Sequence, residues 1–100
     1  MGKFNSHGER IKAAIIATGL DLWRVDPASV SARRIGQTLG MTHGAILYHF
    51  GSTGALKMAI ANEAVRTGDS IVTPLLIVSN HPAAASLTAE QRQAYLTGIN

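Results

Sequence analysis

The stretch from Leu39 to Leu56 reads LGMTHGAILYHFGSTGAL, and it predicts the fold around which the rest of the chain is arranged. Gly40 is placed to end a helix in the left-handed conformation, and Thr42 is placed to begin the next helix as its N-cap. Gly51 breaks the pattern again, and Ser52 is the expected cap of a further helix. Two short helices joined by a three- or four-residue glycine turn have the geometry of a helix-turn-helix, so this stretch predicts a DNA-binding module.

The sequence before this stretch predicts two more helices. Ser6 to Glu9 has the S-x-x-E form of a capping box, and apolar residues then recur at helical spacing to about Trp23. A turn is expected at 26–29, because proline disfavours helix in the residue before it. Ser31 is the expected cap of a helix over 32–39, and Gly19 within the first helix favours close packing against a neighbour. The expected core-facing residues are Ile11, Ala14, Ile15, Thr18, Leu22, Ala32, Ile35, Leu39, Ile46, Phe50, Leu56, Ala59, Ile60 and Ala64.

After a fourth helix over about 53–68, the last 32 residues predict a strongly apolar helical arm. Ser70 or Thr73 is expected to cap a short helix ending at Val78, with Pro74 in its first turn, and 88–91 forms a second capping box that starts a last helix. Such an apolar arm either forms a two-fold interface or folds back over the chain's own core. The interface residues expected are Ile71, Val72, Leu75, Leu76, Val78, Tyr95 and Leu96.

The predicted fold class is therefore all-α: a three-helix bundle that contains the helix-turn-helix, a fourth helix and a short helical C-terminal arm. A chain of 100 residues is long enough for one compact domain. We expect a DNA-binding domain at 1–68 and a dimerisation arm at 69–100.

Composition excludes several classes of protein. The chain has no cysteine, which excludes disulfides, thiolate zinc sites and cysteine nucleophiles. The N-terminus lacks the apolar region of a signal peptide, and the longest strongly apolar run, 71–78, is far shorter than the roughly 20 residues that a membrane helix needs. We therefore expect a cytoplasmic protein with no membrane partner.

The basic residues are concentrated in the first part of the chain. Residues 1–58 hold seven basic and three acidic residues, for a net charge of +4, whereas the remainder holds two basic and three acidic residues, for −1. No acidic residue occurs between Pro27 and Asn62, so this segment can approach a polyanion without like-charge repulsion. The alternative is a chance distribution in a weakly charged chain.

The third helix carries apolar and aromatic residues on the side away from the expected core. Gly44 lets a DNA backbone come close, Leu47 offers an apolar contact to a thymine methyl group or a sugar, and Tyr48 can donate its hydroxyl to a phosphate. Thr42 and His43 lie at the helix N-terminus, which favours anions. The alternative is that Leu47 and Tyr48 pack against another helix.

Catalytic and metal sites are not expected. His43 and His49 are six residues apart, a spacing that does not put two ligands on one helical face. The glycines at 51 and 54 followed by Lys57 lack the spacing of a phosphate-binding loop. No nucleophile-elbow pattern or paired carboxylates occur, so neither an enzyme nor a bound cofactor is expected.

Residues 35–56, IGQTLGMTHGAILYHFGSTGAL, resemble the N-terminal DNA-binding domain of the TetR (tetracycline repressor) family, whose pattern is I-A-x-x-L-G-V-S-x-G-x-L-Y-Y-H-F-x-S-K-x-x-L. The resemblance extends over about 9–66. It implies DNA contacts from the start of the second helix, from the third helix and from the start of the fourth. The candidate DNA-binding residues are Arg33, Arg34, Thr42, His43, Gly44, Leu47, Tyr48, His49, Ser52, Thr53 and Lys57.

The sequence departs from the family in four places. Thr53 stands where the family usually has lysine, which removes a phosphate contact or moves it to Lys57, and Leu47 replaces the first tyrosine of the usual pair. Residues 23–29 match the end of the family's first helix poorly. Only about 32 residues follow the fourth helix, too few to enclose a pocket of roughly 300 Å³ in one chain, so no small-molecule effector is expected.

The function expected from the residues and the resemblance together is that of a bacterial transcriptional repressor that binds a palindromic operator as a homodimer. The alternative is a protein-interaction module that keeps the same helical fold and binds no DNA.

Overall fold

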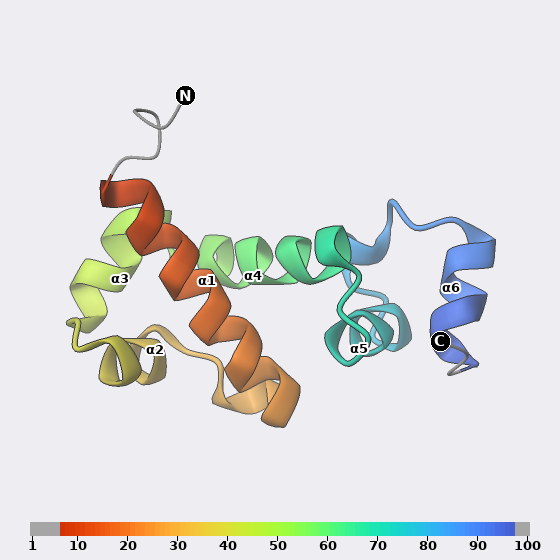
Figure 1. The fold of residues 1–100 in the computed structure, drawn as a ribbon, viewed down its shortest axis with the longest axis horizontal. Coiled ribbons are helices and arrows are strands. Elements are labelled where there is room, and N and C mark those ends of the chain that lie inside the picture. The colour runs from red at the N-terminus through yellow and green to blue at the C-terminus, as the bar shows by residue number, and fades with distance from the viewer. Residues whose placement is uncertain (1–6, 98–100) are drawn as a thin grey trace. The chain divides into compact units, whose positions relative to one another are not determined.

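The computed structural model describes residues 7–97, and all the regular structure in this range is helical (Figure 1). The predicted all-α fold class is therefore confirmed. Ser6, the predicted cap of the first helix, lies outside the described residues. The elements are α1 (His7–Val25), the 3-10 turn η2 (Pro27–Ser29), α2 (Ala32–Leu39), α3 (His43–Phe50), α4 (Thr53–Thr67), α5 (Val72–Val78), the 3-10 turn η3 (Pro82–Ala84) and α6 (Ala89–Leu96).

The chain forms two compact units, residues 1–60 and 61–100, so the division falls inside α4 and not after it as we predicted. The reason is a contact from the end of α4 to α5. The Thr73 hydroxyl is fully buried and donates a hydrogen bond to the Ala64 carbonyl oxygen at 3.2 Å. The last turns of α4 therefore belong to the core of the second unit.

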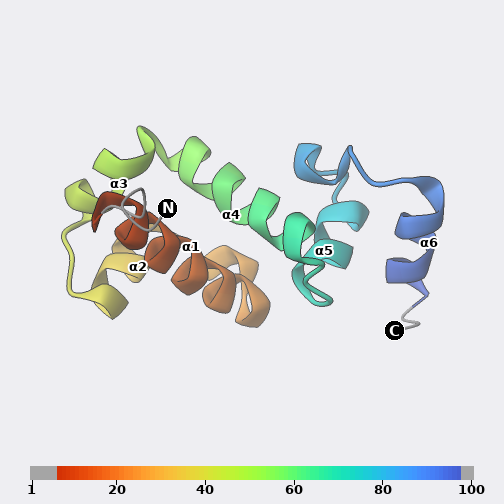
Figure 2. The ribbon, with the colours of Figure 1, turned by 45° about the horizontal axis from the view of Figure 1, so that its top comes forward.

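In the first unit, α2 and α3 contact each other and both contact α1 (Figure 2). Gly19 of α1 allows this packing, because a Cβ atom there would collide with Ile60 and meet Ile35 at 3.5 Å. The predicted reason for a glycine inside α1 is thus confirmed. The buried apolar residues of this unit are Ile15, Leu20, Val30, Ala32, Ile35, Ile46, Leu56 and Ile60.

The predicted core was wrong at Ala14, which is exposed, and missed Leu20, which is buried. The predicted stripe followed sequence spacing alone, whereas the direction from which α2 and α3 cover α1 decides which of its residues are enclosed. Six further predicted core residues are only half-buried: Ile11, Thr18, Leu22, Leu39, Phe50 and Ala59.

The caps of the helix-turn-helix are those predicted from sequence. Ser31 accepts a hydrogen bond from the Arg34 amide at 3.1 Å, and Thr42 accepts one from the Ala45 amide at 3.0 Å. Between these helices, Gly40 has a left-handed backbone with φ 71°. These local interactions end α2 and begin α3 within three residues.

A second glycine shapes the same turn. The Met41 amide donates to the Gly36 carbonyl oxygen at 2.9 Å, and a Cβ atom on Gly36 would collide with the Met41 carbonyl oxygen. The chain can therefore fold back closely over the end of α2 only because position 36 has no side chain.

In the second unit, α5 contacts η3 and α6. Neither predicted cap of α5 is used. Asp69 takes this role, because its carboxylate accepts hydrogen bonds from the amides of Ile71 at 3.0 Å and Val72 at 2.8 Å, while Thr73 lies inside the helix. Pro74 falls in the first turn, as predicted.

The last helix is fixed by its own cap and by one arginine. Thr88 and Gln91 form the predicted capping box. Arg92 is half-buried and donates to the carbonyl oxygens of Ala84 at 2.9 Å and Leu87 at 3.2 Å. A Cβ atom on Gly68 would lie 3.2 Å from the Tyr95 hydroxyl oxygen, so α6 also packs close to the end of α4.

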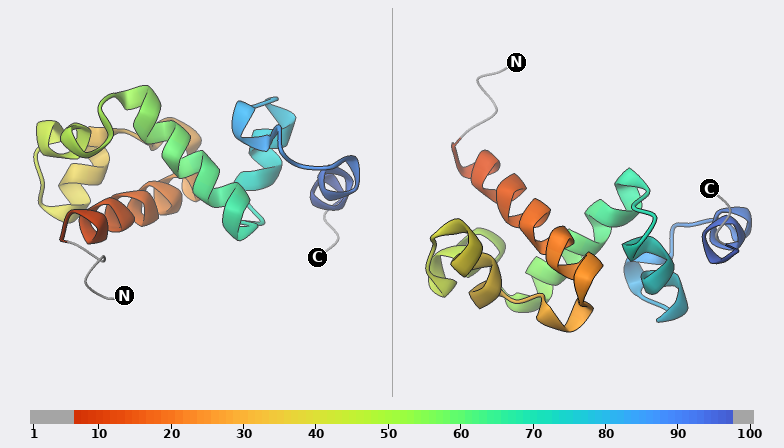
Figure 3. Two further views of the ribbon diagram at one scale, coloured as in Figure 1. Left: turned by 90° about the horizontal axis from the view of Figure 1, so that it is seen from above. Right: turned by 60° about the horizontal axis from the view of Figure 1, so that its bottom comes forward.

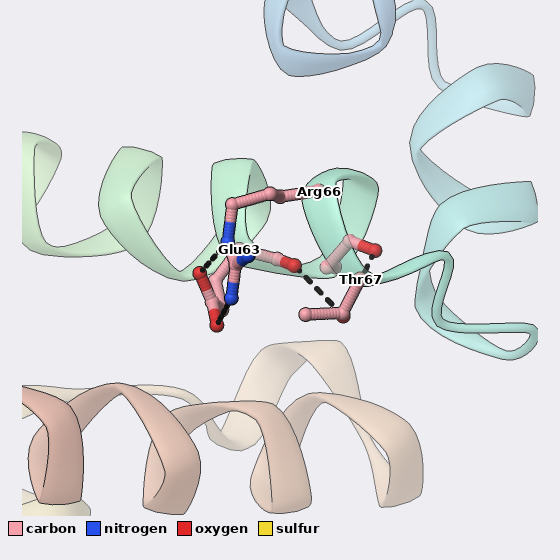
Figure 4. Close-up of polar contacts among 4 residues, drawn as sticks. Glu63, Arg66 and Thr67 are labelled. Carbon is pink, nitrogen blue, oxygen red and sulfur yellow. Dashed lines mark hydrogen bonds and ion pairs between the residues drawn. The ribbon is translucent and has the colours of Figure 1, made fainter.

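On α4, Arg66 forms a bidentate ion pair with Glu63 (Figure 4). Its Nε and Nη2 atoms lie 2.8 and 2.7 Å from the two carboxylate oxygens. The hydrogen bond from Arg66 lowers the pKa of Glu63, and its positive charge acts in the same direction. The Thr67 hydroxyl donates to the Glu63 carbonyl oxygen at 2.9 Å in the same turn.

Replacing Gly40 by alanine should lower the free energy of unfolding by about 1–2 kcal/mol, because an L side chain is strained at this positive φ. Gly44→Ala is the matched control: it lies inside α3 with nothing within 4 Å, so the higher helix propensity of alanine should raise stability by up to about 1 kcal/mol. Urea unfolding of both variants measures the difference. Equal effects would contradict the assigned conformation of Gly40.

Glu63→Gln should lower stability at neutral pH by less than about 1 kcal/mol, because the ion pair is solvent-exposed. The pKa of Glu63 is lower when folded than when unfolded, so its contribution is present above the unfolded pKa and is lost as the pH falls through the folded one. The thermal midpoints of wild type and variant should therefore converge as the pH falls below the ordinary carboxyl pKa of about 4. A difference that persisted at lower pH would contradict the ion pair as its source.

Candidate nucleic-acid interface

The candidate residues lie on α2, on α3 and at the start of α4, all within the first unit. Figure 3 shows these three segments, yellow to light green, grouped at one end of that unit. The turn at Gly40 joins α2 to α3, and the two helices contact each other. The structure thus brings the predicted site residues to neighbouring elements.

Helix α3 has one buried side and one uncovered side. Ile46 is completely buried, whereas the Tyr48 side chain is 84% exposed. Thr42, His43 and Gly44 are also exposed. The first turn of α3 and its tyrosine are therefore accessible, and packing against another helix does not account for Tyr48.

Two predicted contacts on α3 are less accessible than expected. Leu47 and His49 are half-buried, so part of each side chain serves the packing of the unit. The rings of Tyr48 and His49 meet edge to face, with centroids 5.6 Å apart and an interplanar angle of 80°. His49 is thus in contact with the one exposed aromatic ring of α3.

The N-termini of α3 and α4 repeat one pattern, Thr42-His43-Gly44-Ala45 and Ser52-Thr53-Gly54-Ala55. In each, the capping hydroxyl oxygen accepts from the alanine amide at 3.0 Å. The two amides before each alanine have no acceptor inside their helix, as at any helix start. Such N–H groups, together with the helix dipole, favour an anion at both positions.

The glycine of each pattern leaves its helix end open. Among residues 7–97, no atom outside the first turn lies within 4 Å of the position that a Cβ atom would take on Gly44, and on Gly54 the Ser52 hydroxyl oxygen alone comes within that distance, at 3.9 Å. Each glycine therefore leaves space beside the first turn of its helix. Gly54 was not among the predicted site residues, although the repeated spacing would have identified it.

The cations of α2 and of the first half of α4 are exposed. Arg33 and Arg34 lie in the first turn of α2, and Lys57 lies in the first turns of α4. No acidic residue occurs between Pro27 and Asn62, so α2 and the first turns of α4 carry no carboxylate; Glu63, later in α4, is paired with Arg66. Gln37 is exposed one turn after Arg33, and the i, i+4 spacing would have added it to the predicted set.

The predicted dimer residues divide into two groups. Val72 and Leu76 are buried inside the second unit, so their assignment to an interface with another chain was wrong. The packing of α5 within its own unit encloses one side of the helix. Tyr95 is half-buried, and the exposed members are Ile71, Leu75, Val78 and Leu96.

Within residues 7–97, no three histidine, aspartate or glutamate side chains gather closely enough to hold a metal ion. In the same range, no helix combines the length and the apolar character needed to cross a membrane. Comparison of the chain with protein-family models, curated proteins and solved structures finds no match.

Truncating a side chain on the buried side of α3 should lower the free energy of unfolding much more than truncating one on its exposed side. Ile46→Ala should lower the free energy of unfolding by about 2–5 kcal/mol, because it leaves a cavity in the core. Tyr48→Ala should change it by less than about 0.5 kcal/mol, because the side chain is mostly in solvent. Chemical unfolding of both variants makes the comparison, and a large loss for Tyr48→Ala would place this tyrosine in the core.

Proposed function

We propose that the chain is a sequence-specific DNA-binding transcriptional regulator whose α3 enters the major groove. One observation carries the proposal: on a helix-turn-helix, the first turn of α3 and Tyr48 are uncovered, with open space at Gly44. In this motif the N-terminal residues of the second helix are those that reach base edges. His43 and Tyr48 are therefore the side chains with the best access to DNA.

Phosphates would be held around this helix. The amide groups at the starts of α3 and α4 offer donors that suit phosphate oxygens, and Arg33, Arg34 and Lys57 supply positive charge. Such contacts position a protein on the duplex but do not read its sequence. The exposed residues of α3 would instead contact the bases. The accessible part of Leu47 could contact a thymine methyl group.

The resemblance of 35–56 to the TetR DNA-binding domain supports the same function. The structure gives the exposure of the residues at two of the departures from that pattern. Thr53 is exposed but carries no charge, and Leu47 is half-buried and has no hydroxyl. We therefore expect a weaker grip on phosphate than the family pattern implies, with Lys57 and the α4 amides replacing the missing lysine.

A regulator of this kind represses by occluding a promoter. Two copies on a palindromic operator would place their α3 helices about 34 Å apart, in successive major grooves. In this proposal the protein acts in the cytoplasm of a bacterium, and repression requires no small-molecule effector.

The test is the salt dependence of binding to duplex DNA, measured by fluorescence anisotropy. The logarithm of the binding constant should fall linearly with the logarithm of salt concentration, and Arg33→Gln should reduce the slope by about 0.9 if it removes one phosphate contact. Arg66→Gln is the matched control, because it removes the same charge from a residue that is paired with Glu63 in the second unit. Its slope should equal that of the wild type.

Equal effects of the two substitutions would mean that the first unit does not provide the DNA-binding surface. Absence of binding to any duplex at low salt would contradict the proposal and leave the protein-interaction module, in which Tyr48 would contact a protein partner.

A further inference from the structure

Helix α3 carries few side chains that can form hydrogen bonds with the edge of a base. Its sequence, HGAILYHF, contains no arginine, lysine, asparagine, glutamine, aspartate or glutamate. Those residue types make the contacts that distinguish guanine, adenine and cytosine in the major groove. His43 and Tyr48 are the exposed polar side chains of α3, and neither has the paired donor and acceptor of an amide or the fork of a guanidinium.

Helix α2 carries the residue types that α3 lacks, but its place in the motif is different. Arg33, Arg34 and Gln37 are exposed on α2. In a helix-turn-helix the first helix crosses the DNA backbone, and the second lies in the major groove. The polar side chains of α2 are therefore placed for phosphates, and contact with the bases falls to α3.

The exposed side of α3 has an open space next to apolar groups. Among residues 7–97, no side chain other than those of its chain neighbours lies within 4 Å of the position that a Cβ atom would take on Gly44. Leu47 and Tyr48 follow at i+3 and i+4, so they are the neighbours of Gly44 on the helix surface. Because a Cβ atom of alanine is a methyl group, this space accepts a methyl group in contact with the helix.

We propose that the space at Gly44 receives the C5 methyl group of a pyrimidine, so that α3 reads thymine or 5-methylcytosine by apolar contact. The inference rests on the proposed DNA-binding function and adds to it the chemical class of base that α3 recognises. The C5 methyl of thymine is the apolar group that a base pair presents in the major groove. Cytosine lacks this group, and 5-methylcytosine carries it at the same ring position.

The size of the effect distinguishes this contact from a hydrogen-bonded one. Burial of a single methyl-sized group changes a binding constant by roughly fourfold. A good bidentate hydrogen-bonded pair changes it by roughly five- to 150-fold. A small preference that follows the methyl group, and not the polar groups of the base, is therefore the expected signature.

The experiment uses the duplex that selection from random DNA enriches, with each thymine of the bound site replaced in turn by uracil. Uracil keeps the base pairing and every polar group of thymine, and it lacks the methyl group. At the position that responds, cytosine and 5-methylcytosine opposite guanine provide a second pair that differs by the same group. Affinities are measured by fluorescence anisotropy at one salt concentration.

The wild type should bind thymine roughly fourfold more tightly than uracil at this position, and 5-methylcytosine more tightly than cytosine by a similar factor. Gly44→Ala puts a methyl group of the protein in the same space, so it should bind the uracil duplex at least as tightly as the thymine duplex. Gly54→Ala is the matched control, because it makes the same substitution at the corresponding position of α4. Whatever its affinity, its thymine-to-uracil ratio should equal that of the wild type.

Three results would overturn the inference while leaving DNA binding intact. These are equal wild-type affinities for thymine and uracil at every position, a thymine preference that Gly44→Ala retains, and a Gly44→Ala protein that binds neither duplex. Failure of the wild type to bind any duplex would instead overturn the proposed function, and this inference with it.

Discussion

The turn between α2 and α3 is the constraint on which the proposed site depends. Gly40 takes the left-handed conformation, the Met41 amide donates to the Gly36 carbonyl oxygen, and the missing side chain at Gly36 leaves room for the returning chain. A turn this tight sets the rotation of α3 about its axis. Ile46 is therefore buried, and Tyr48, two residues later, points to solvent. Any lengthening of the turn would change which residues of α3 reach a partner.

Charge and apolar surface are divided between the two units in a way that fits separate roles. The first unit carries the exposed cations of α2 and α4 and two open helix N-termini, which suit a polyanion. The second unit has an uncharged segment, 70–89, in which Ile71, Leu75 and Val78 are exposed. The exposed cations of α2 and α4 and the exposed apolar residues of 71–78 thus lie in different units.

Helix boundaries were predictable wherever a local signal decides them. Ser31, Gly40, Thr42 and Thr88 each act through hydrogen bonds or backbone angles within a few residues, and the structure has them in the predicted roles. The start of α5 was not predictable in this way. Asp69, Ser70 and Thr73 are all capping residue types, and the choice depends on Thr73 being drawn into the core by its bond to Ala64.

Burial was the less predictable property. Spacing along a helix identifies an apolar side but not the direction from which other helices cover it. For that reason Ala14 was placed in the core, and Val72 and Leu76 were placed at a dimer interface. On α3 the exposure of Gly44 and Tyr48 followed from spacing, whereas the partial burial of Leu47 and His49 depends on the neighbouring elements.

The central claim is that the uncovered side of α3 reads DNA bases. Selection of bound duplexes from random DNA, carried out in parallel with the wild type and with His43→Ala, tests it most directly. The wild type should enrich a defined sequence, and His43→Ala should relax the preference at one position by about 1–3 kcal/mol while the rest of the sequence persists. No enriched sequence for the wild type, or identical preferences for both proteins, would contradict it.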